Sequence, residues 1–324
     1  MIRFVRRLIP FLAAIMMVTA EAVPEKGARV QSLRVTILST MLADGSGLGE
    51  WGFAALVEAD GRRILFDTGM HRDLVLKNIG SLRFDVAAVP EVVLSHSHSD
   101  HVGGLMALRE SVLPGSPQAL SRVHAGKGIF YPRTEDGSLV ETNPMIPLKT
   151  QYERTGGMFV VHDRPVQLHP GVWLTGPIPR KHPERNWSGS DKVRTPDGIV
   201  EDDIPEDTAL VIDTDRGLVV ITGCGHAGVV NTIEYARSII RPARIHALIG
   251  GLHLFNAADD TLAWTAGKLR EFGVENLIGA HCTGIETVYR LRADLGLDRA
   301  HAVVGAVGAT FDLGQGIDPG HIAR

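Results

Sequence analysis

Hydrophobic and polar positions along this chain alternate between two patterns, one typical of buried strands and one typical of amphipathic helices. Short apolar runs that end in Gly, Pro or Asp predict strands, because the runs suit a buried sheet and these residues suit turns. The predicted strands span residues 32–40, 53–59, 62–69, 121–125, 157–163, 171–176, 208–214, 218–225, 244–255 and 302–313, with further strands opening 89–104 and 275–284. Helices are predicted at 70–82, 226–240, 261–273 and 285–296, with another beginning at Leu105.

Two segments of the chain repeat the same order of elements. Residues 57–75 and 212–230 each contain a turn, an apolar strand, a Thr-Gly tip and the start of a helix. Two ββα halves with their helices outside predict an α/β fold, a four-layer αββα sandwich. Loops from both halves then meet at one edge, where a shared site can form. We expect one domain over residues 30–324, with a surface insertion or lid in the polar segment 181–206.

The first 22 residues have the pattern of a secretory signal peptide. Arg3, Arg6 and Arg7 precede an apolar run, and the stretch ends in a small-x-small triplet. The run from Leu8 to Ala20 is short for a membrane anchor, which is the alternative interpretation. We therefore expect cleavage and a periplasmic or secreted protein with no stable membrane span, exported by the general or the twin-arginine route.

Composition and charge narrow the class of partner. The chain has 324 residues, 44% hydrophobic, which is ordinary for a globular protein with a large core. Its net charge of −4 gives no indication of nucleic-acid binding, so we expect a small-molecule substrate. Nothing in the sequence determines the oligomeric state. The two cysteines, Cys224 and Cys282, form one disulfide in the simplest interpretation of an exported protein.

The segment SHSHSDHVGG, residues 95–104, carries the strongest chemical signal. Imidazole and carboxylate groups suit zinc, iron or manganese. His96 and His98 point the same way along an extended segment and can share one metal, whereas Asp100 and His101 lie in the following turn and can face a second. A solvated polar loop would not need these side chains at this spacing. The segment therefore predicts a metal site.

This motif, His-x-His-x-Asp-His after a strand, resembles the signature of the metallo-β-lactamase superfamily. The resemblance runs from about Ser32 to Leu313. It implies the αββα sandwich that the internal repeat also predicts. It further implies one or two divalent metal ions, with zinc as the first expectation and iron or manganese as alternatives.

The resemblance assigns roles to three further residues. Asp67, in LFDTG, would be a buried carboxylate that orients the metal ligands, or else a simple turn former. His281, in LIGAHCTG, matches the late metal histidine of the superfamily. Cys224 stands where the superfamily usually has a bridging aspartate, and thiolate is a good zinc ligand. The competing interpretation is a nucleophilic Cys224 with His226 as its base.

One ligand of the superfamily pattern is absent from its usual place. A histidine normally precedes the Cys224 position, but the segment 202–207 holds acidic residues instead. His226 is the first candidate to replace that histidine, His124 is the second, and an Asp of 202–207 is the third. We expect His253, at another strand end, to line the site; a structural core histidine is the alternative.

Six segments together resemble one branch of the superfamily, named for 7,8-dihydropterin-6-methyl-4-(β-D-ribofuranosyl)aminobenzene-5′-phosphate synthase: ILFDTG, SHSHSDHVGG, TGPIPR, VVITGCGHAGVVN, IGGLHL and AHCTG. Relatives in this branch often have Glu-His-Gly where this chain has Glu50-Trp51-Gly52.

The expected function is that of a metal-dependent hydrolase of a phosphoester, lactone or related ester. Asp100 would hold a metal and steer the proton of the attacking water. Arg180 would bind a phosphate or carboxylate, or else be a solvated surface residue. The alternatives are a synthase-like transferase on the same site and a non-catalytic protein that binds a metal or ligand.

Overall fold

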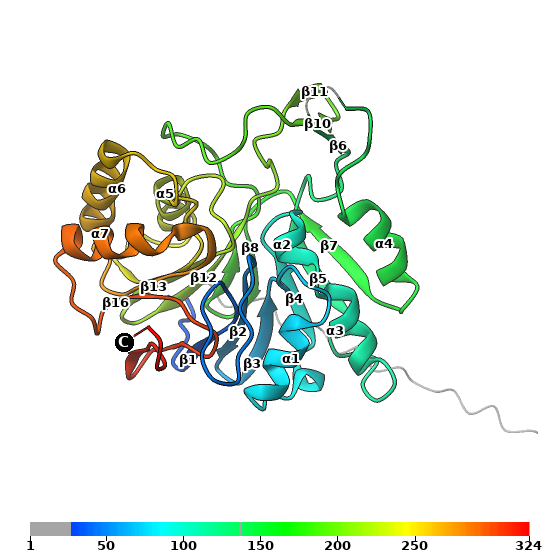
Figure 1. Cartoon of the computed structure of the whole chain (residues 1–324), viewed down its shortest axis with the longest axis horizontal. Coiled ribbons are helices and arrows are strands. Elements are labelled where there is room, and N and C mark those ends of the chain that lie inside the picture. The colour runs from blue at the N-terminus through cyan, green and yellow to red at the C-terminus, as the bar shows by residue number, and fades with distance from the viewer. Residues whose placement is uncertain (1–26, 136–137, 324) are drawn as a thin grey trace, which may run out of the picture.

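Two large β-sheets pack face to face in the computed structural model, which describes residues 27–135 and 138–323 (Figure 1). The first sheet has the spatial strand order β18 (Gly316–Asp318), β17 (Thr310–Asp312), β1 (Leu33–Ser39), β2 (Ala54–Ala59), β3 (Arg62–Phe66), β4 (Glu91–Leu94), β5 (Arg122–Gly126) and β7 (Met158–His162). The second sheet has the order β16 (Ala302–Val304), β15 (Leu277–Gly279), β14 (Ile245–Gly250), β13 (Gly217–Thr222), β12 (Ala209–Thr214), β9 (Val172–Leu174) and β8 (Val166–His169).

Helices cover the outer face of each sheet (Figure 1). The first sheet is covered by α1 (Leu74–Ser81), α2 (Ser99–Val102), α3 (Leu105–Val112) and α4 (Met145–Glu153), and the second by α5 (Val229–Ile239), α6 (Asp259–Glu271) and α7 (Ile285–Leu295). One apolar cluster fills the space between the sheets, and one lies under each group of helices. The predicted four-layer αββα sandwich is therefore confirmed. Both faces of β12 and β13 are buried, which explains their continuous apolar sequences.

The internal repeat of the sequence corresponds to two equivalent units of the fold. The antiparallel hairpin β2–β3 leads into α1, and the antiparallel hairpin β12–β13 leads into α5. The second strand of each hairpin then pairs in parallel with the next strand of its sheet, β3 with β4 and β13 with β14. Each half therefore presents the carboxyl ends of neighbouring parallel strands at one edge.

That edge collects the residues singled out in the sequence. Asp67 directly follows β3, and His96 follows β4 after one residue. In the second half Cys224 follows β13, His253 follows β14 and His281 follows β15. In open α/β sheets, ligands bind outside the carboxyl ends of the strands. The fold thus brings five chemically active side chains from both halves to one place.

A small third sheet lies beyond this edge, at the top of Figure 1. It consists of β11 (Gly198–Glu201), β10 (Lys192–Thr195) and β6 (Arg133–Thr134), all paired antiparallel. Two of its strands belong to the segment 181–206, for which we expect a surface insertion or lid. The described part of the chain contains no helix that is long and apolar enough to cross a membrane. The predicted signal peptide, residues 1–22, lies outside the described residues.

Some predicted elements differ from the structure. The single strand predicted at 302–313 is wrong, because β16 and β17 belong to different sheets and the chain crosses between them near Gly308, whose φ is +86°. The strand predicted at 244–255 ends at Gly250, which has a φ of +117°. Helix α4 and strand β8 were not predicted from the apolar pattern, because their hydrophobic positions are few and irregular.

Candidate metal centre

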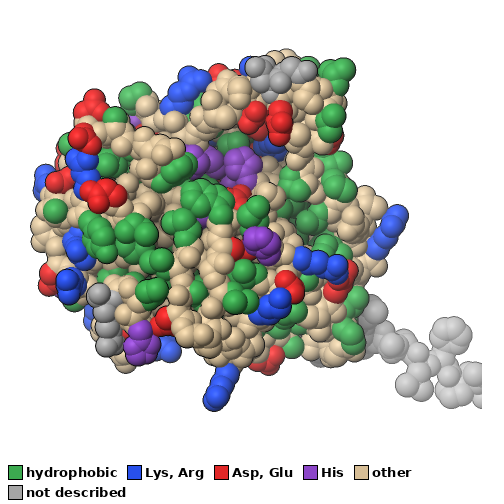
Figure 2. All heavy atoms as spheres, viewed as in Figure 1, with side chains coloured by type: hydrophobic (Ala, Val, Ile, Leu, Met, Phe, Trp, Pro, Cys, Tyr) green, Lys and Arg blue, Asp and Glu red, His purple; other side chains and the backbone are tan. Residues whose placement is uncertain are grey.

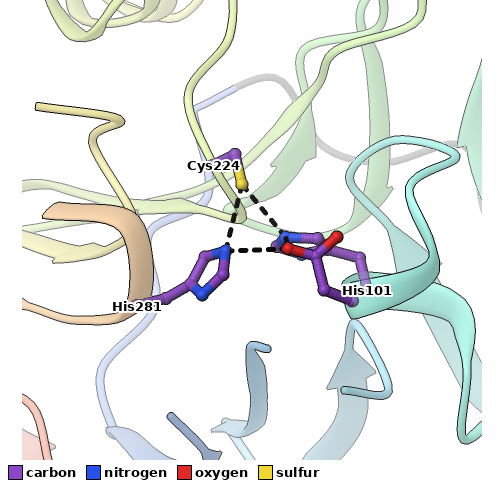
Figure 3. Close-up of side chains that lie close together, drawn as sticks. His101, Cys224 and His281 are labelled. Carbon is purple, nitrogen blue, oxygen red and sulfur yellow. Dashed lines mark hydrogen bonds and ion pairs between the residues drawn. The ribbon is translucent and has the colours of Figure 1, made fainter. Parts of the chain in front are cut away.

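Four side chains converge on a point between the two sheets. Nε2 of His101 lies 3.1 Å from Sγ of Cys224, which lies 3.3 Å from Nε2 of His281 (Figure 3). Oδ2 of Asp100 lies 3.2 Å from the same His281 nitrogen and 3.7 Å from Nε2 of His101. One potential ligand atom from each of the four lies within 4.8 Å of every other. This group offers sulfur, nitrogen and oxygen donors for one ion.

A second group meets the first at Cys224. Potential ligand atoms of His96, Cys224 and His226 also lie within 4.8 Å of one another. His98 completes this side, because its ring centroid is 4.6 Å from that of His96 and 4.8 Å from that of His226. The structure therefore places both Cys224 and His226 at the centre, with Cys224 shared between the two groups. This arrangement can hold two ions.

The opposite ring nitrogen of several histidines is held by a hydrogen-bond partner. Nδ1 of His101 lies 2.7 Å from Oδ2 of Asp67, and Nδ1 of His96 lies 2.9 Å from Oγ of Ser95. Asp67 also accepts hydrogen bonds from the backbone N–H and the hydroxyl of Ser95. Nδ1 of His226 contacts the carbonyl oxygen of Asn186 at 2.5 Å. Such contacts orient imidazoles and leave the other nitrogen for a metal.

Two histidine ring nitrogens that accept or donate no hydrogen bond within the described residues are suited to bind a metal ion. Nε2 of His96 and Nε2 of His226 are buried and have no hydrogen-bond partner among the described residues. Buried polar atoms without partners are costly, so a native structure normally satisfies them. A cation at the centre would satisfy both and would also neutralise Asp100. We conclude that the residues present fit a divalent metal, as the superfamily resemblance implies.

Burial and mutual repulsion set the protonation of these side chains. Burial and the neighbouring histidines hold the pKa of His96 and of His226 well below its usual range, and burial lowers the pKa of His98 to about 4. These rings are therefore neutral near pH 7, the form that binds metals. Burial opposes ionisation of Asp100, but His101 and His281 outweigh it and lower its pKa. Burial raises the pKa of the Cys224 thiol, so a cation is needed to hold it as thiolate.

Three of the residues at this edge have a strained backbone conformation. Asp67, His253 and His281 have φ values of +55°, +51° and +48°, in the left-handed region that non-glycine residues seldom adopt. Each of the three lies just beyond a parallel strand. Such strain persists where surrounding structure holds it, and it is frequent at functional sites. Here it turns the side chains back toward the centre rather than along the strand direction.

A cavity of about 360 Å³ opens above the metal ligands. Histidine side chains are visible in a recess beside hydrophobic ones on the face shown in Figure 2. Trp51 forms one wall, with its ring centroid 4.9 Å from that of His281, and Trp187, Ser188 and Asp191 of the segment 181–206 form another. His253 also lines this cavity, as expected, and Nδ1 of His253 has no hydrogen-bond partner in the described part of the chain.

Two predicted site residues lie elsewhere. His124 is not at the centre: its Nδ1 lies 3.0 Å from Nε2 of His162, because β5 ends beside β7 rather than at the second sheet. Arg180 does not reach the cavity, since its guanidinium donates to the carbonyl oxygens of Asp203 and Ile204. Both assignments are therefore corrected.

The remaining alternatives for the absent ligand are also accounted for. Asp207 accepts the backbone N–H of Ala227 and is buried, which raises the pKa of Asp207 to about 7. Asp202 pairs with Arg133 at 2.7 Å. Neither belongs to the groups of converging ligand atoms. Cys224 and Cys282 are both free, so the disulfide interpretation is not supported by the structure.

The sequence interpretation missed three parts of the site. Ser95 lies inside the histidine motif, but its hydrogen bond to Asp67 joins residues 28 positions apart and has no local sequence signal. The Asn186 carbonyl carries no sequence signal, since any residue has one. Glu206 accepts the backbone N–H of Ser97 at 3.0 Å and pairs with the buried Arg133 at 2.5 Å, a link that only folding reveals.

Comparison with known proteins agrees with this geometry. The model of the metallo-beta-lactamase superfamily matches residues 52–116, the stretch that contains Asp67 and the histidine motif. The αββα architecture and this match together show that the chain has the metallo-β-lactamase fold. Proteins of this fold generally bind divalent metals, and the cluster around Cys224 is the place where this chain could do so.

Particular relatives resemble most of the chain. The 7,8-dihydropterin-6-methyl-4-(beta-D-ribofuranosyl)-aminobenzene-5'-phosphate synthase of Methanocaldococcus jannaschii is 28% identical, over 77% of this chain and 86% of its own length. Tm1679, whose solved structure is described as a metal-dependent hydrolase of the beta-lactamase superfamily, is 28% identical in sequence to this chain. The two structures match with a TM-score of 0.66 over 81% of this chain and 93% of Tm1679. YhfI from Bacillus subtilis shares the fold alone, with 15% identity, a TM-score of 0.54 and coverage of 87% and 99%. The resemblance to the synthase branch is thus confirmed.

Proposed function

We propose that this protein is a metal-dependent hydrolase that binds two divalent ions and cleaves a phosphoester, lactone or related ester. The observation that carries the proposal is the position of the Cys224 sulfur, which belongs to three groups of converging ligand atoms at once. It meets Asp100, His101 and His281 in one group, His96 and His226 in a second, and His253 and Cys282 in a third. The mixed sulfur, nitrogen and oxygen donors favour zinc, with iron or manganese as alternatives. The likeness to Tm1679, described as a metal-dependent hydrolase, supports the same activity.

Such ions, when bound, polarise an ester or phosphoryl oxygen and lower the pKa of a water molecule to near neutrality. His96, His98 and His226 would hold one ion, and Asp100, His101 and His281 the other, with Cys224 shared. Asp100, whose side chain is 15% exposed, lines the cavity together with candidate ligands of both groups.

Asp100 is the group placed to handle a proton. Its Oδ2 is paired with Nε2 of His281, and Asp100 lines the cavity where substrate would enter. Its lowered pKa keeps it ionised, so it can accept a hydrogen bond from the attacking water and orient the oxygen lone pair toward the ester. Trp51 and Trp187 line the same cavity and limit the access of bulk water.

A synthase-like transferase is the second candidate. The name of the relative from Methanocaldococcus jannaschii and its 28% identity favour that reaction. The two functions would use the same ligands, so the metal centre alone does not separate them. Substrate tests do: a hydrolase transfers the acyl or phosphoryl group to water, whereas a transferase needs a second organic substrate.

Elemental analysis combined with a hydrolysis panel tests the proposal. We expect about two equivalents of zinc, iron or manganese per chain in protein as purified, and turnover of at least one phosphodiester, lactone or aryl ester. His98→Ala should lose metal and turnover together, whereas His301→Ala, on an exposed loop, should change neither. Full turnover by His98→Ala would refute the assigned site. A metal-loaded protein that hydrolyses nothing but transfers a group to an amine would favour the synthase-like reaction.

A further inference from the structure

A second and larger cavity lies next to the one above the metal ligands. Its volume is about 620 Å³, compared with about 360 Å³ for the cavity at the centre. Trp187 and His253 line both cavities, so the two spaces meet at these side chains. A substrate with its ester at the metal ligands would therefore have room to extend past His253 into the larger space.

Three large aromatic side chains stand among the polar and apolar residues in the wall of the larger cavity. Trp187, Phe255 and Trp264 all line it. Phe255 is 42% exposed, and its ring packs edge-on against Trp51, itself 43% exposed, with 5.5 Å between the centroids. It is favourable for another ring to cover large aromatic rings that are exposed to water beside a cavity, because apolar surface is then removed from water. The wall thus suits a flat aromatic group.

The indole of Trp187 is held in position before any ligand arrives. Its Nε1 donates to the carboxylate of Glu201 on β11, and the guanidinium groups of Arg185 and Arg180 lie 5.4 Å and 5.5 Å from its rings. A side chain with this many partners loses little freedom on binding, so a contact with it adds affinity efficiently. Arg180, which does not reach the metal cavity, acquires a role here as a support for Trp187.

Two buried polar atoms of residues that line the larger cavity have no hydrogen-bond partner among residues 27–135 and 138–323. They are Nδ1 of His253, where the two cavities meet, and Oγ1 of Thr265, the residue after Trp264 on α6. The Glu184 carboxylate, by contrast, is occupied, because it accepts the backbone N–H groups of Val230 and Asn231. A ligand that carries ring heteroatoms would satisfy His253 and Thr265, whereas a plain hydrocarbon chain would leave both unpaired.

Resting on the proposed hydrolase function, we propose that the larger cavity binds a planar aromatic or heteroaromatic part of the substrate while the metal ligands hold its ester. The reaction adds the elements of water across the ester bond. The bond between the carbonyl carbon or phosphorus and the ester oxygen breaks, the acid forms, and the aromatic alcohol leaves with one proton. Trp264 and Thr265 determine specificity and do not take part in the bond changes.

A pair of esters that differ only in aromaticity tests this subsite. The 2-naphthylmethyl and decahydronaphthylmethyl esters, prepared as acetates and as methyl phosphates, have leaving alcohols of similar bulk and acidity. We expect the naphthyl compounds to have a KM about 3–10-fold lower, in line with aromatic contacts of about 0.5–1.5 kcal/mol. Trp264→Leu should remove this preference by raising KM for the naphthyl ester alone, with kcat unchanged. Tyr289→Leu, on the exposed side of α7, is the matched control.

Binding of the alcohol alone separates this proposal from the hydrolase proposal. Calorimetric titration of the protein as purified with 2-naphthylmethanol should show one site, weakened 3–10-fold in Trp264→Leu and preserved in Tyr289→Leu. Thr265→Val, which keeps the shape, should leave 2-naphthylmethanol unaffected but weaken 2-quinolylmethanol. Naphthyl binding without hydrolysis of any ester would keep the subsite and overturn the hydrolase. Hydrolysis of both ester series with equal KM would keep the hydrolase and overturn the subsite.

Discussion

The sulfur of Cys224 lies 3.1 Å from Nε2 of His101, although the two residues stand 123 positions apart and belong to opposite halves of the sandwich. Each lies just beyond the carboxyl end of a parallel strand: His101 in the short helix α2 that follows β4, and Cys224 in the loop that follows β13. Because Cys224 also belongs to the group formed by His96 and His226, a change at this one sulfur should affect both groups of ligand atoms.

Replacement of Cys224 tests its shared position. Cys224→Ser should lower the metal content by at least one equivalent, since a hydroxyl does not ionise as a thiol does. Cys224→Asp should restore metal binding, because the superfamily usually offers a carboxylate at this place. Metal content by elemental analysis and the melting temperature with and without chelator measure both effects. Equal metal content in Cys224→Ser and the parent protein would contradict the shared role.

Asp67 should act on the metals without touching them. Its carboxylate holds His101 and Ser95, so Asp67→Asn would leave the His101 ring less firmly oriented and less basic. We expect about a 10–100-fold loss of metal affinity, as is usual when such an outer partner is removed. Competition with a fluorescent chelator gives the affinity. Asp294→Asn, on the exposed surface of α7, should keep the parent value, and an equal loss in both variants would indicate a general electrostatic effect instead.

The two cysteines should both be reactive thiols once the chain is unfolded. Cys224 and Cys282 are free, and Sγ of Cys282 lies 3.6 Å from the carbonyl oxygen of Cys224. Protein purified without reductant, then denatured in the presence of a chelator, should therefore give two thiols per chain in a colorimetric thiol assay. In the folded, metal-loaded protein the count should fall, since both side chains are buried. Zero thiols after denaturation would mean that a disulfide forms after all.

Mild acid should destabilise the protein through a histidine pair away from the metal ligands. Burial and the neighbouring His124 lower the pKa of His162 to about 4, from about 6.5 in an unfolded chain. The unfolded state therefore binds this proton more readily, so stability is highest above pH 6.5 and falls as pH drops from 6.5 toward 4.

Because His162 is partly exposed, its contribution to the free energy of unfolding should be on the order of 1 kcal/mol after screening by solvent. Urea unfolding of parent and His162→Gln at pH 7.5 and pH 5 measures it, and the variant should lose less stability on acidification. His301→Gln serves as the exposed control. The same loss in His162→Gln and the parent would exclude the histidine pair as the cause.

The sequence alone determined the class of fold and most of the candidate metal ligands. Alternation of apolar runs and turns predicted two ββα halves, because strands covered on both faces must be continuously apolar. The short spacing of His96, His98, Asp100 and His101 predicted a metal site, because neighbouring residues on one loop share a location whatever the rest of the chain does. Local patterns of this kind can be recognised in the sequence because they depend on few contacts between distant residues.

Only the tertiary structure decided how the two halves complete the centre. The distance from His226 to His96 depends on how the two sheets pack, and no local pattern encodes that distance. For the same reason the sequence does not exclude His124, which the pairing of β5 with β7 places away from the centre. The supports from Ser95 and the Asn186 carbonyl likewise arise from packing. Residues far apart in the chain meet only where the packing of the two sheets brings them together, and that packing depends on all the core contacts of the fold.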